Sequence, residues 1–240
     1  MRVVIMQPSY LPWLGYFDLF LASDLFLYYD VVQYDKNGWR NRNRIKTPNG
    51  PLWLTVPVLT KGLNKPSNKD VRIDTKEPWQ RKHIKSLEMN YRKAPHFDEV
   101  FPIFEKVLSQ PRESLLDLNT EAISEMSSYL GIHTPSKCVS DLKLDLPDDM
   151  EANRKLIEIC KEVGADEFYE PAGGMTYIEP KLFRDEGIRL TFQNYQHPEY
   201  SQLHGNFVSH LSTADLLFNC GRESLSVLDT HRHQKKESIA

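Results

Sequence analysis

The chain has 240 residues, of which 40% are hydrophobic and 26% charged, and its net charge at pH 7 is −3. These values are typical of a globular protein and exclude a largely disordered chain, and the slight acidity argues against binding of long nucleic acid along a broad basic face. Three widely spaced cysteines without a CxxC motif argue against a disulfide framework.

The first 33 residues have the pattern of a βαβ unit. Residues 2–6 predict a buried strand, residues 15–23 a helix and residues 25–32 a second strand. Parallel strands bind ligands beyond their carboxyl ends. Polar residues gather there, at 7–10 and 30–33, so we expect a ligand site at this edge.

The remaining chain predicts a helical middle and further strands. Residues 34–51 lack apolar periodicity and are expected to form a long loop. Strands are predicted over 53–59, 167–170 and 188–194, and helices over 78–91, 97–108, 114–130, 149–163 and 213–219. The predicted fold is α/β, with an N-terminal βαβ, Rossmann-like parallel sheet and a helical middle region. We expect one domain over 1–232, with a helical subregion at about 78–131, and a polar tail over 233–240.

A basic segment follows the second predicted strand. It has five basic residues between 36 and 46 and no acidic residue among them. Arginine forks bind phosphate or carboxylate, amides add hydrogen-bond donors, and an indole stacks on a base or sugar. The candidate binding residues are Lys36, Trp39, Arg40, Asn41, Arg42, Asn43 and Arg44. The alternative is a solvated charged loop.

The turn after the first predicted strand is a second candidate. Its sequence is Gln7-Pro8-Ser9-Tyr10-Leu11-Pro12-Trp13-Leu14-Gly15-Tyr16. A helix begins near Gly15, and helix N-termini attract anions. Gln7, Tyr10, Tyr16 and, from the next strand end, Gln33 are candidate binding residues. The position resembles that of the HxGH turn of nucleotidylyltransferases, but both histidines are absent; the alternative is a buried aromatic turn.

Asp30 and His197 are candidate general bases, because each follows a predicted strand and histidine titrates near neutral pH. Lys36 is a further candidate catalytic residue.

The glycine pair at 173–174 lets a backbone approach a ligand, although a plain turn explains it as well. The spacing of His197, His204 and His210 fits no zinc motif, so no metal is expected. No P-loop, GxGxxG, GxSxG or HExxH motif is present, and no cofactor is identified. The short apolar N-terminal run lacks a signal-peptide core, and no apolar stretch is long enough to span a membrane, so we expect a cytoplasmic protein without membrane insertion.

The chain resembles the WbqC-like protein family over nearly its whole length. The segments that carry the resemblance are residues 6–17, 30–34, 36–45, 53–58, 195–198 and 211–221, with Trp79, His83 and Tyr91. The resemblance implies a role in bacterial surface-polysaccharide synthesis of the O-antigen type. It also implies a transferase that adds glycine or another acyl group to an amino sugar, and it carries over no catalytic residue.

The sequence therefore predicts a transferase that moves an aminoacyl or acyl group to a nucleotide-linked amino sugar. The expected partner is an anionic small molecule, either a nucleotide-sugar or an acyl or aminoacyl donor, and a carrier protein or aminoacyl donor is a further candidate. Two alternatives stay open: a nucleotidyl-transfer or nucleotide-activating enzyme on a related scaffold, and a non-catalytic binder of sugars or nucleotides.

Overall fold

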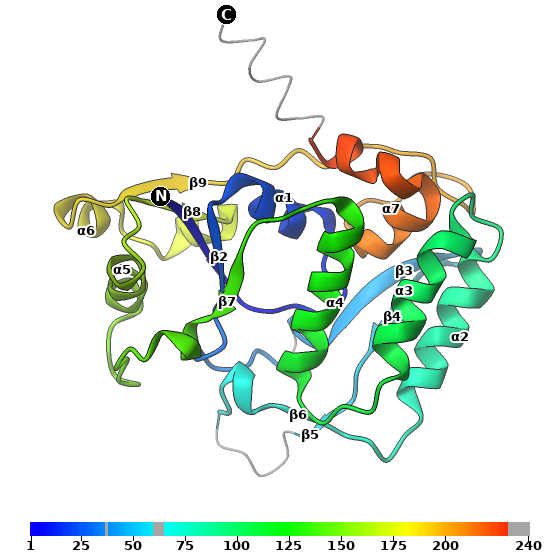
Figure 1. Ribbon diagram of the computed structural model, residues 1–240, viewed down its shortest axis with the longest axis horizontal. Helices are drawn as coiled ribbons and strands as arrows, with labels where there is room; N and C mark the ends of the chain where they lie inside the picture. The colour runs from blue at the N-terminus through cyan, green and yellow to red at the C-terminus, as the bar shows by residue number, and fades with distance from the viewer. Residues whose placement is uncertain (37, 60–64, 230–240) are drawn as a thin grey trace, which may run out of the picture.

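The computed structural model describes residues 1–36, 38–59 and 65–229 (Figure 1). Its helices are α1 (Leu14–Ala22), α2 (Trp79–Tyr91), α3 (Phe97–Ser109), α4 (Leu115–Leu130), α5 (Ala152–Glu162), α6 (Pro180–Asp185) and α7 (Thr213–Cys220). Its strands are β1 (Arg2–Met6), β2 (Leu25–Tyr28), β3 (Arg42–Thr47), β4 (Gly50–Thr55), β5 (Val58–Leu59), β6 (Arg72–Ile73), β7 (Ser136–Cys138), β8 (Glu167–Glu170) and β9 (Arg189–Phe192).

The central sheet is parallel and has the strand order β7-β2-β1-β8-β9. In chain order its strands therefore run third, second, first, fourth, fifth, which is the order of one half of a Rossmann sheet and its continuation. In register, Val3 faces Leu25 on β2 and Phe168 on β8. The predicted α/β fold with a Rossmann-like parallel sheet is confirmed.

Successive side chains of β1 and β2 point to opposite faces of the sheet and so divide the apolar core into two layers. Val3, Ile5 and Leu27 pack against α5 and α6, while Val4 and Phe26 pack against α1, the middle helices and α7. Strands buried on both faces read as continuous aliphatic runs, which is why residues 2–6 were recognisable. Figure 1 shows α5 and α6 on one side of the sheet and α2, α3, α4 and α7 on the other.

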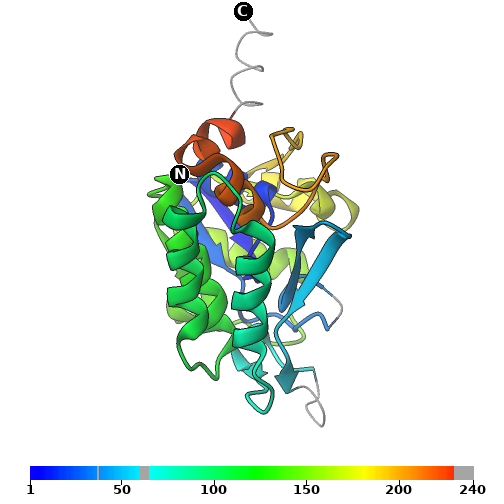
Figure 2. The ribbon, with the colours of Figure 1, turned by 90° about the vertical axis from the view of Figure 1, so that its right-hand side faces the viewer.

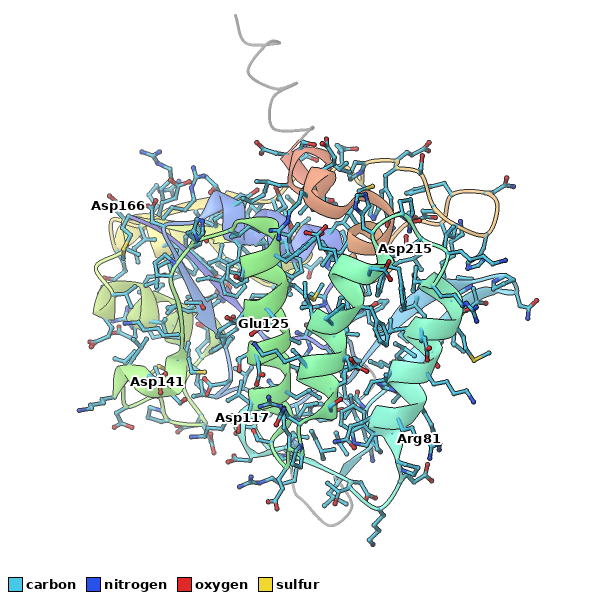
Figure 3. The ribbon with its side chains drawn as sticks, turned by 45° about the vertical axis from the view of Figure 1, so that its right-hand side comes forward. Arg81, Asp117, Glu125, Asp141, Asp166 and Asp215 are labelled. Atoms are coloured by element: carbon cyan, nitrogen blue, oxygen red, sulfur yellow. The ribbon has the colours of Figure 1, made fainter. Side chains whose placement is uncertain are left out.

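The amino ends of the parallel strands lie at one side of the sheet and their carboxyl ends at the opposite side, which are called its amino and carboxyl edges. Asp166 precedes β8 and Asp141 follows β7, and they lie toward opposite edges in Figure 3. The edge near Asp141 holds the carboxyl ends of all five strands, because the strands are parallel. Asp215, labelled in the same view, lies in the first turn of α7 and accepts hydrogen bonds from the hydroxyls of Tyr91 and Tyr200.

The long loop predicted over 34–51 was wrong in part. Residues 42–47 and 50–55 form an antiparallel hairpin in which Arg44 faces Trp53. The two residues between the strands are Pro48 and Asn49, and Gly50, the first residue of β4, has a φ of +98° that favours glycine. One face of β3 buries Asn43 and Ile45, and the other carries Arg42 and Arg44.

The other predicted elements have observed counterparts, with shifted ends. The strand predicted over 25–32 ends at Tyr28, and β6, β7 and α6 were not predicted. The polar tail at 233–240 lies outside the described residues. No helix in the described part of the chain is both long enough and apolar enough to cross a membrane.

Candidate functional site

A crevice of about 450 Å³ opens at the carboxyl edge of the sheet, between the strand ends and α5. Its walls come from the ends of β1, β2 and β8 and from the start of α5. They consist of Ile5, Met6, Gln7, Tyr29, Val32, Asp148, Met150, Ala152, Lys155, Leu156, Glu170 and Tyr177. The strand order reverses between β1 and β8, and open α/β sheets bind their ligands at such a switch point.

Glu170, the last residue of β8, is the buried acid of this crevice. Only 5% of it is exposed, and burial raises its pKa to about 8. The hydroxyl of Tyr177 donates a hydrogen bond to Glu170 Oε1 at 3.0 Å. Gly174 packs so closely that a Cβ there would lie 2.4 Å from Glu170 Cγ. A carboxyl group that titrates near neutral pH in a cleft is a candidate acid or base.

Two further polar groups face the same space. Lys155, in the first turns of α5, donates from Nζ to the carbonyl of Asp148 at 3.1 Å. Tyr29 follows β2, and burial raises its pKa to about 12. One cation, two phenols and two acids, Asp148 and Glu170, thus line a largely apolar crevice of a size suited to a small molecule.

Gln7 connects this crevice to the basic segment. Its Oε1 accepts from Asn68 Nδ2 at 3.2 Å, and its backbone carbonyl accepts from Arg40 Nη1 at 3.2 Å. Arg40 also donates to Ser9 Oγ at 3.0 Å, and burial lowers its pKa. Arg40 therefore brings the start of the basic segment to the end of the first strand.

Asp30 and His197 have contacts typical of supporting residues. Asp30 is fully buried and accepts from the backbone N–H and the hydroxyl of Ser140, which links the ends of β2 and β7. His197 Nε2 accepts from the N–H of His210, and its Nδ1 contacts the carbonyl of Pro198 at 2.9 Å. With both ring nitrogens engaged, and a pKa lowered by burial, His197 is not poised to take a proton.

Four more of the predicted binding residues are buried in hydrogen bonds within the protein. Tyr10 pairs with His83 Nδ1 at 2.8 Å, and Tyr16 donates to the carbonyl of Gln7. Asn41 donates to the carbonyl of Val56, and Asn43 donates to that of Leu11 at 2.7 Å. The bond from Asn43 holds the turn after β1 against the hairpin, and the bond from Tyr10 holds it against α2. Gln33 and Lys36 are exposed.

Arg42 and Arg44 lie on the outer face of the hairpin, away from the crevice walls. Their guanidinium carbons lie 4.7 and 5.6 Å from the ring centre of Trp53. Arg44 also lies 5.8 Å from the ring of Trp39, and the two indoles are 5.3 Å apart. The structure thus brings Gln7 and Arg40 together at the crevice and places Arg42, Arg44 and Trp39 on a separate surface.

Sequence reasoning missed four residues of the crevice: Tyr29, Lys155, Glu170 and Tyr177. Glu170 and Tyr177 flank the glycine pair, which the sequence alone explains equally well as a turn. The available signal was that Glu170 ends a predicted strand. Only the strand order, which puts β8 beside β1, brings Glu170 next to Gln7. Among the residues described, no group of three or more His, Cys, Asp or Glu is arranged to hold a metal ion.

Comparison with known proteins agrees with the resemblance seen in the sequence. The sequence profile of the WbqC-like protein family matches residues 7–227. A Mycobacterium tuberculosis protein titled "Uncharacterized protein Rv1507c" is 37% identical over 228 residues, which cover 93% of this chain and 95% of that protein. No solved structure matches.

Proposed function

The chain belongs to the WbqC-like protein family, and from that premise we propose that it is a cytoplasmic transferase of surface-polysaccharide precursor synthesis. Its crevice binds a nucleotide-linked amino sugar, and the enzyme adds an aminoacyl or acyl group to the sugar amine. The observation that carries this proposal is the buried acid Glu170 in the crevice between β1 and β8, beside Lys155 and two tyrosines. The family is consistent with a role related to polysaccharides.

The polar groups of the crevice suit an acceptor that has both an amine and a phosphate. Lys155 supplies a positive charge for phosphate, and its Nζ is held by a neutral carbonyl rather than by a carboxylate. Tyr29, Tyr177 and Gln7 offer hydrogen bonds to sugar hydroxyls. Ile5 and Leu156 supply apolar surface for a sugar ring.

Glu170 is the proton acceptor in this proposal. The amine nitrogen attacks the acyl carbon of the donor, and the bond from that carbon to the carrier oxygen or sulfur breaks. The amine proton passes to the Glu170 carboxylate, which then returns it to the leaving group. With a pKa of about 8, Glu170 accepts a proton readily and returns it readily near neutral pH.

Positioning supplies the rest of the rate, because a neutral amine is already a good nucleophile once it is held against the acyl carbon. Arg40 fixes the backbone at Gln7 and so shapes the crevice. Asp30, which ties β2 to β7, acts as a positioning residue rather than as the base.

Calorimetric titration with a nucleoside-diphosphate-linked amino sugar tests the binding half of the proposal. Lys155→Met is expected to weaken binding about tenfold or more, the usual effect of losing a charge-assisted contact. Lys181→Met, which removes an exposed lysine on α6, is the matched control and leaves affinity unchanged. Undetectable binding by the native protein, or equal losses in the two variants, contradicts the assignment.

Turnover tests the chemical half. Glu170→Gln should lower kcat by roughly 10²–10⁴, the contribution typical of a general base, with a much smaller effect on KM. The native rate should rise with pH and level off above about pH 8, where Glu170 is ionised. Release of pyrophosphate from a nucleoside triphosphate would instead identify the nucleotidyl-transfer alternative.

A further inference from the structure

The outer face of the β3–β4 hairpin is a platform of two exposed indoles and two half-buried arginines, away from the crevice. It comprises Trp39, Arg42, Arg44 and Trp53, and Figure 2 shows the hairpin at the flank of the molecule opposite α3 and α4. Trp39 and Trp53 are 41% and 43% exposed. Large aromatic side chains this open to solvent, grouped on one surface, mark a binding site rather than a core.

The platform is preformed. On its inner face, Asn43 and Ile45 are buried, and Asn43 donates to the carbonyl of Leu11. The carbonyl of Arg44 accepts from the N–H of Ser212 at 2.8 Å, and Arg44 Nη2 donates to the carbonyl of His210 at 3.3 Å. A surface held by backbone and side-chain contacts on both sides binds a partner with little ordering cost.

The platform lies in the most basic part of the sequence. Residues 36–69 contain eight lysines and arginines and no acidic residue, a charge of +8 within 34 positions, while the rest of the chain carries −11. Lys46 is buried against Gln202 and two carbonyls, so it adds nothing to the surface. Lys36, Lys65 and Lys69 are exposed. Arg40 is turned inward to Gln7, Lys61 lies outside the described residues, and Asp35 and Asp70 flank the segment, so the surface around the platform is moderately basic and favours an anionic partner.

We propose that this platform binds the unpaired 3′ nucleotides of an aminoacyl-tRNA, which is then the donor substrate; the identification of the donor rests on the proposed function. Bases stack on the two indoles, and phosphates meet the outer edges of the stacked guanidinium groups. Stacking aromatics combined with a basic surface is how proteins hold single strands without reading their sequence. A neutral glycan fits less well, because acidic partners for its hydroxyls are absent from the sequence of the hairpin.

The distance to the crevice suits this arrangement. Arg40 contacts Gln7 at the crevice wall, and Arg44 follows four residues later. Because the chain bends at residues 40 and 41 before β3 begins, the two residues lie at most about 13 Å apart at the rise of a strand. An acyl group on the terminal ribose can therefore reach the crevice while the preceding nucleotides lie on the hairpin. A short, unpaired strand also reconciles nucleic-acid binding with a chain of net charge −3.

Fluorescence anisotropy tests the platform without catalysis. The probe is a labelled RNA minihelix that ends in unpaired 5′-ACCA-3′, and the comparison ligands are the blunt minihelix, coenzyme A and a neutral oligosaccharide. We expect the overhang probe to bind best. Trp53→Ala should weaken it roughly ten- to a hundredfold, because stacking of one base is lost. Trp53→Phe should restore part of the affinity, and raised salt should weaken binding steeply.

Arg222→Ala is the matched control. Arg222 also stacks on an aromatic ring, 4.2 Å above Tyr129, but it is paired with Glu99 at a different surface. The control should bind the probe as the native protein does.

Equal binding of blunt and overhang RNA, tighter binding of coenzyme A or the glycan, or no effect of Trp53→Ala would overturn the proposal. Self-association that Trp53→Ala abolishes would assign the platform to a second copy of the chain and would overturn it as well. If the RNA probe does not bind but the nucleotide-sugar does, only the assignment of tRNA as the donor is contradicted. If the RNA probe binds but the nucleotide-sugar does not, the proposed function is contradicted and the platform remains an RNA-binding surface.

Discussion

Replacing Glu170 by glutamine is expected to stabilise the protein, and the gain should grow with pH. In the folded chain, burial raises the pKa of Glu170 from 4.5 to about 8. Between these values the folded state holds a proton that the unfolded state has lost, so stability falls as pH rises. Each pKa unit corresponds to ~1.4 kcal/mol, which gives about 5 kcal/mol of destabilisation above pH 8. A neutral amide of the same shape does not carry this cost, and its oxygen still accepts from Tyr177.

Urea unfolding at pH 5 and pH 9 measures the effect directly, because changes at all other groups cancel between native protein and variant. The two proteins should differ little at pH 5, and the variant should be more stable by several kcal/mol at pH 9. Glu162→Gln, which removes an exposed carboxylate at the end of α5, should show no such trend. A difference between native protein and Glu170→Gln that stays constant from pH 5 to pH 9 would refute the assignment of a buried, neutral acid.

Three substitutions test the supports of the site. Gly15→Ala places a Cβ 2.2 Å from the ring of Trp13, so the indole must move; we expect a loss of about 1–3 kcal/mol in urea unfolding. Asp30→Asn replaces a carboxylate that accepts two bonds from Ser140 by a neutral amide with one accepting oxygen, and should lower stability by about 1–3 kcal/mol, seen as a lower melting temperature and faster hydrogen exchange at the ends of β2 and β7. Asp215→Asn weakens the bonds from two tyrosine hydroxyls and should cost a similar amount in guanidinium unfolding, with α7 opening first.

Much of the fold was predictable because its signals are local. Residues 3–6 are all apolar, as the middle of a strand covered on both faces must be, and the apolar residues of 149–163 recur at the spacing of an amphipathic helix. The hairpin was missed because its inward residues include amides: Asn43 is buried by hydrogen bonds rather than by apolarity. Its turn is nevertheless Pro48-Asn49 followed by Gly50, and proline at the second and glycine at the fourth position of a four-residue turn are typical turn residues.

The candidate site was predictable only in part, because strand order is not a local property. The sequence places Gln7 and Glu170 at strand ends, 163 positions apart, and does not say that β8 lies beside β1. The arginines illustrate a second limit. Arg40, two residues before Arg42, turns inward to Gln7, while Arg42 and Arg44 extend along one outer face of β3. A cluster that is continuous in sequence therefore serves two surfaces.

The topology explains why those two surfaces are neighbours. The chain leaves β2 at the carboxyl edge of the sheet and does not enter β7 until residue 136. Because the two strands are parallel, this long excursion must begin at the edge where the crevice opens and return to the opposite edge. Its first elements, the basic segment and the hairpin, are therefore anchored beside Gln7, and its last helix, α4, carries the chain back across the sheet. In the transfer we propose, acceptor and donor sites adjoin because the insertion starts where the parallel strands end.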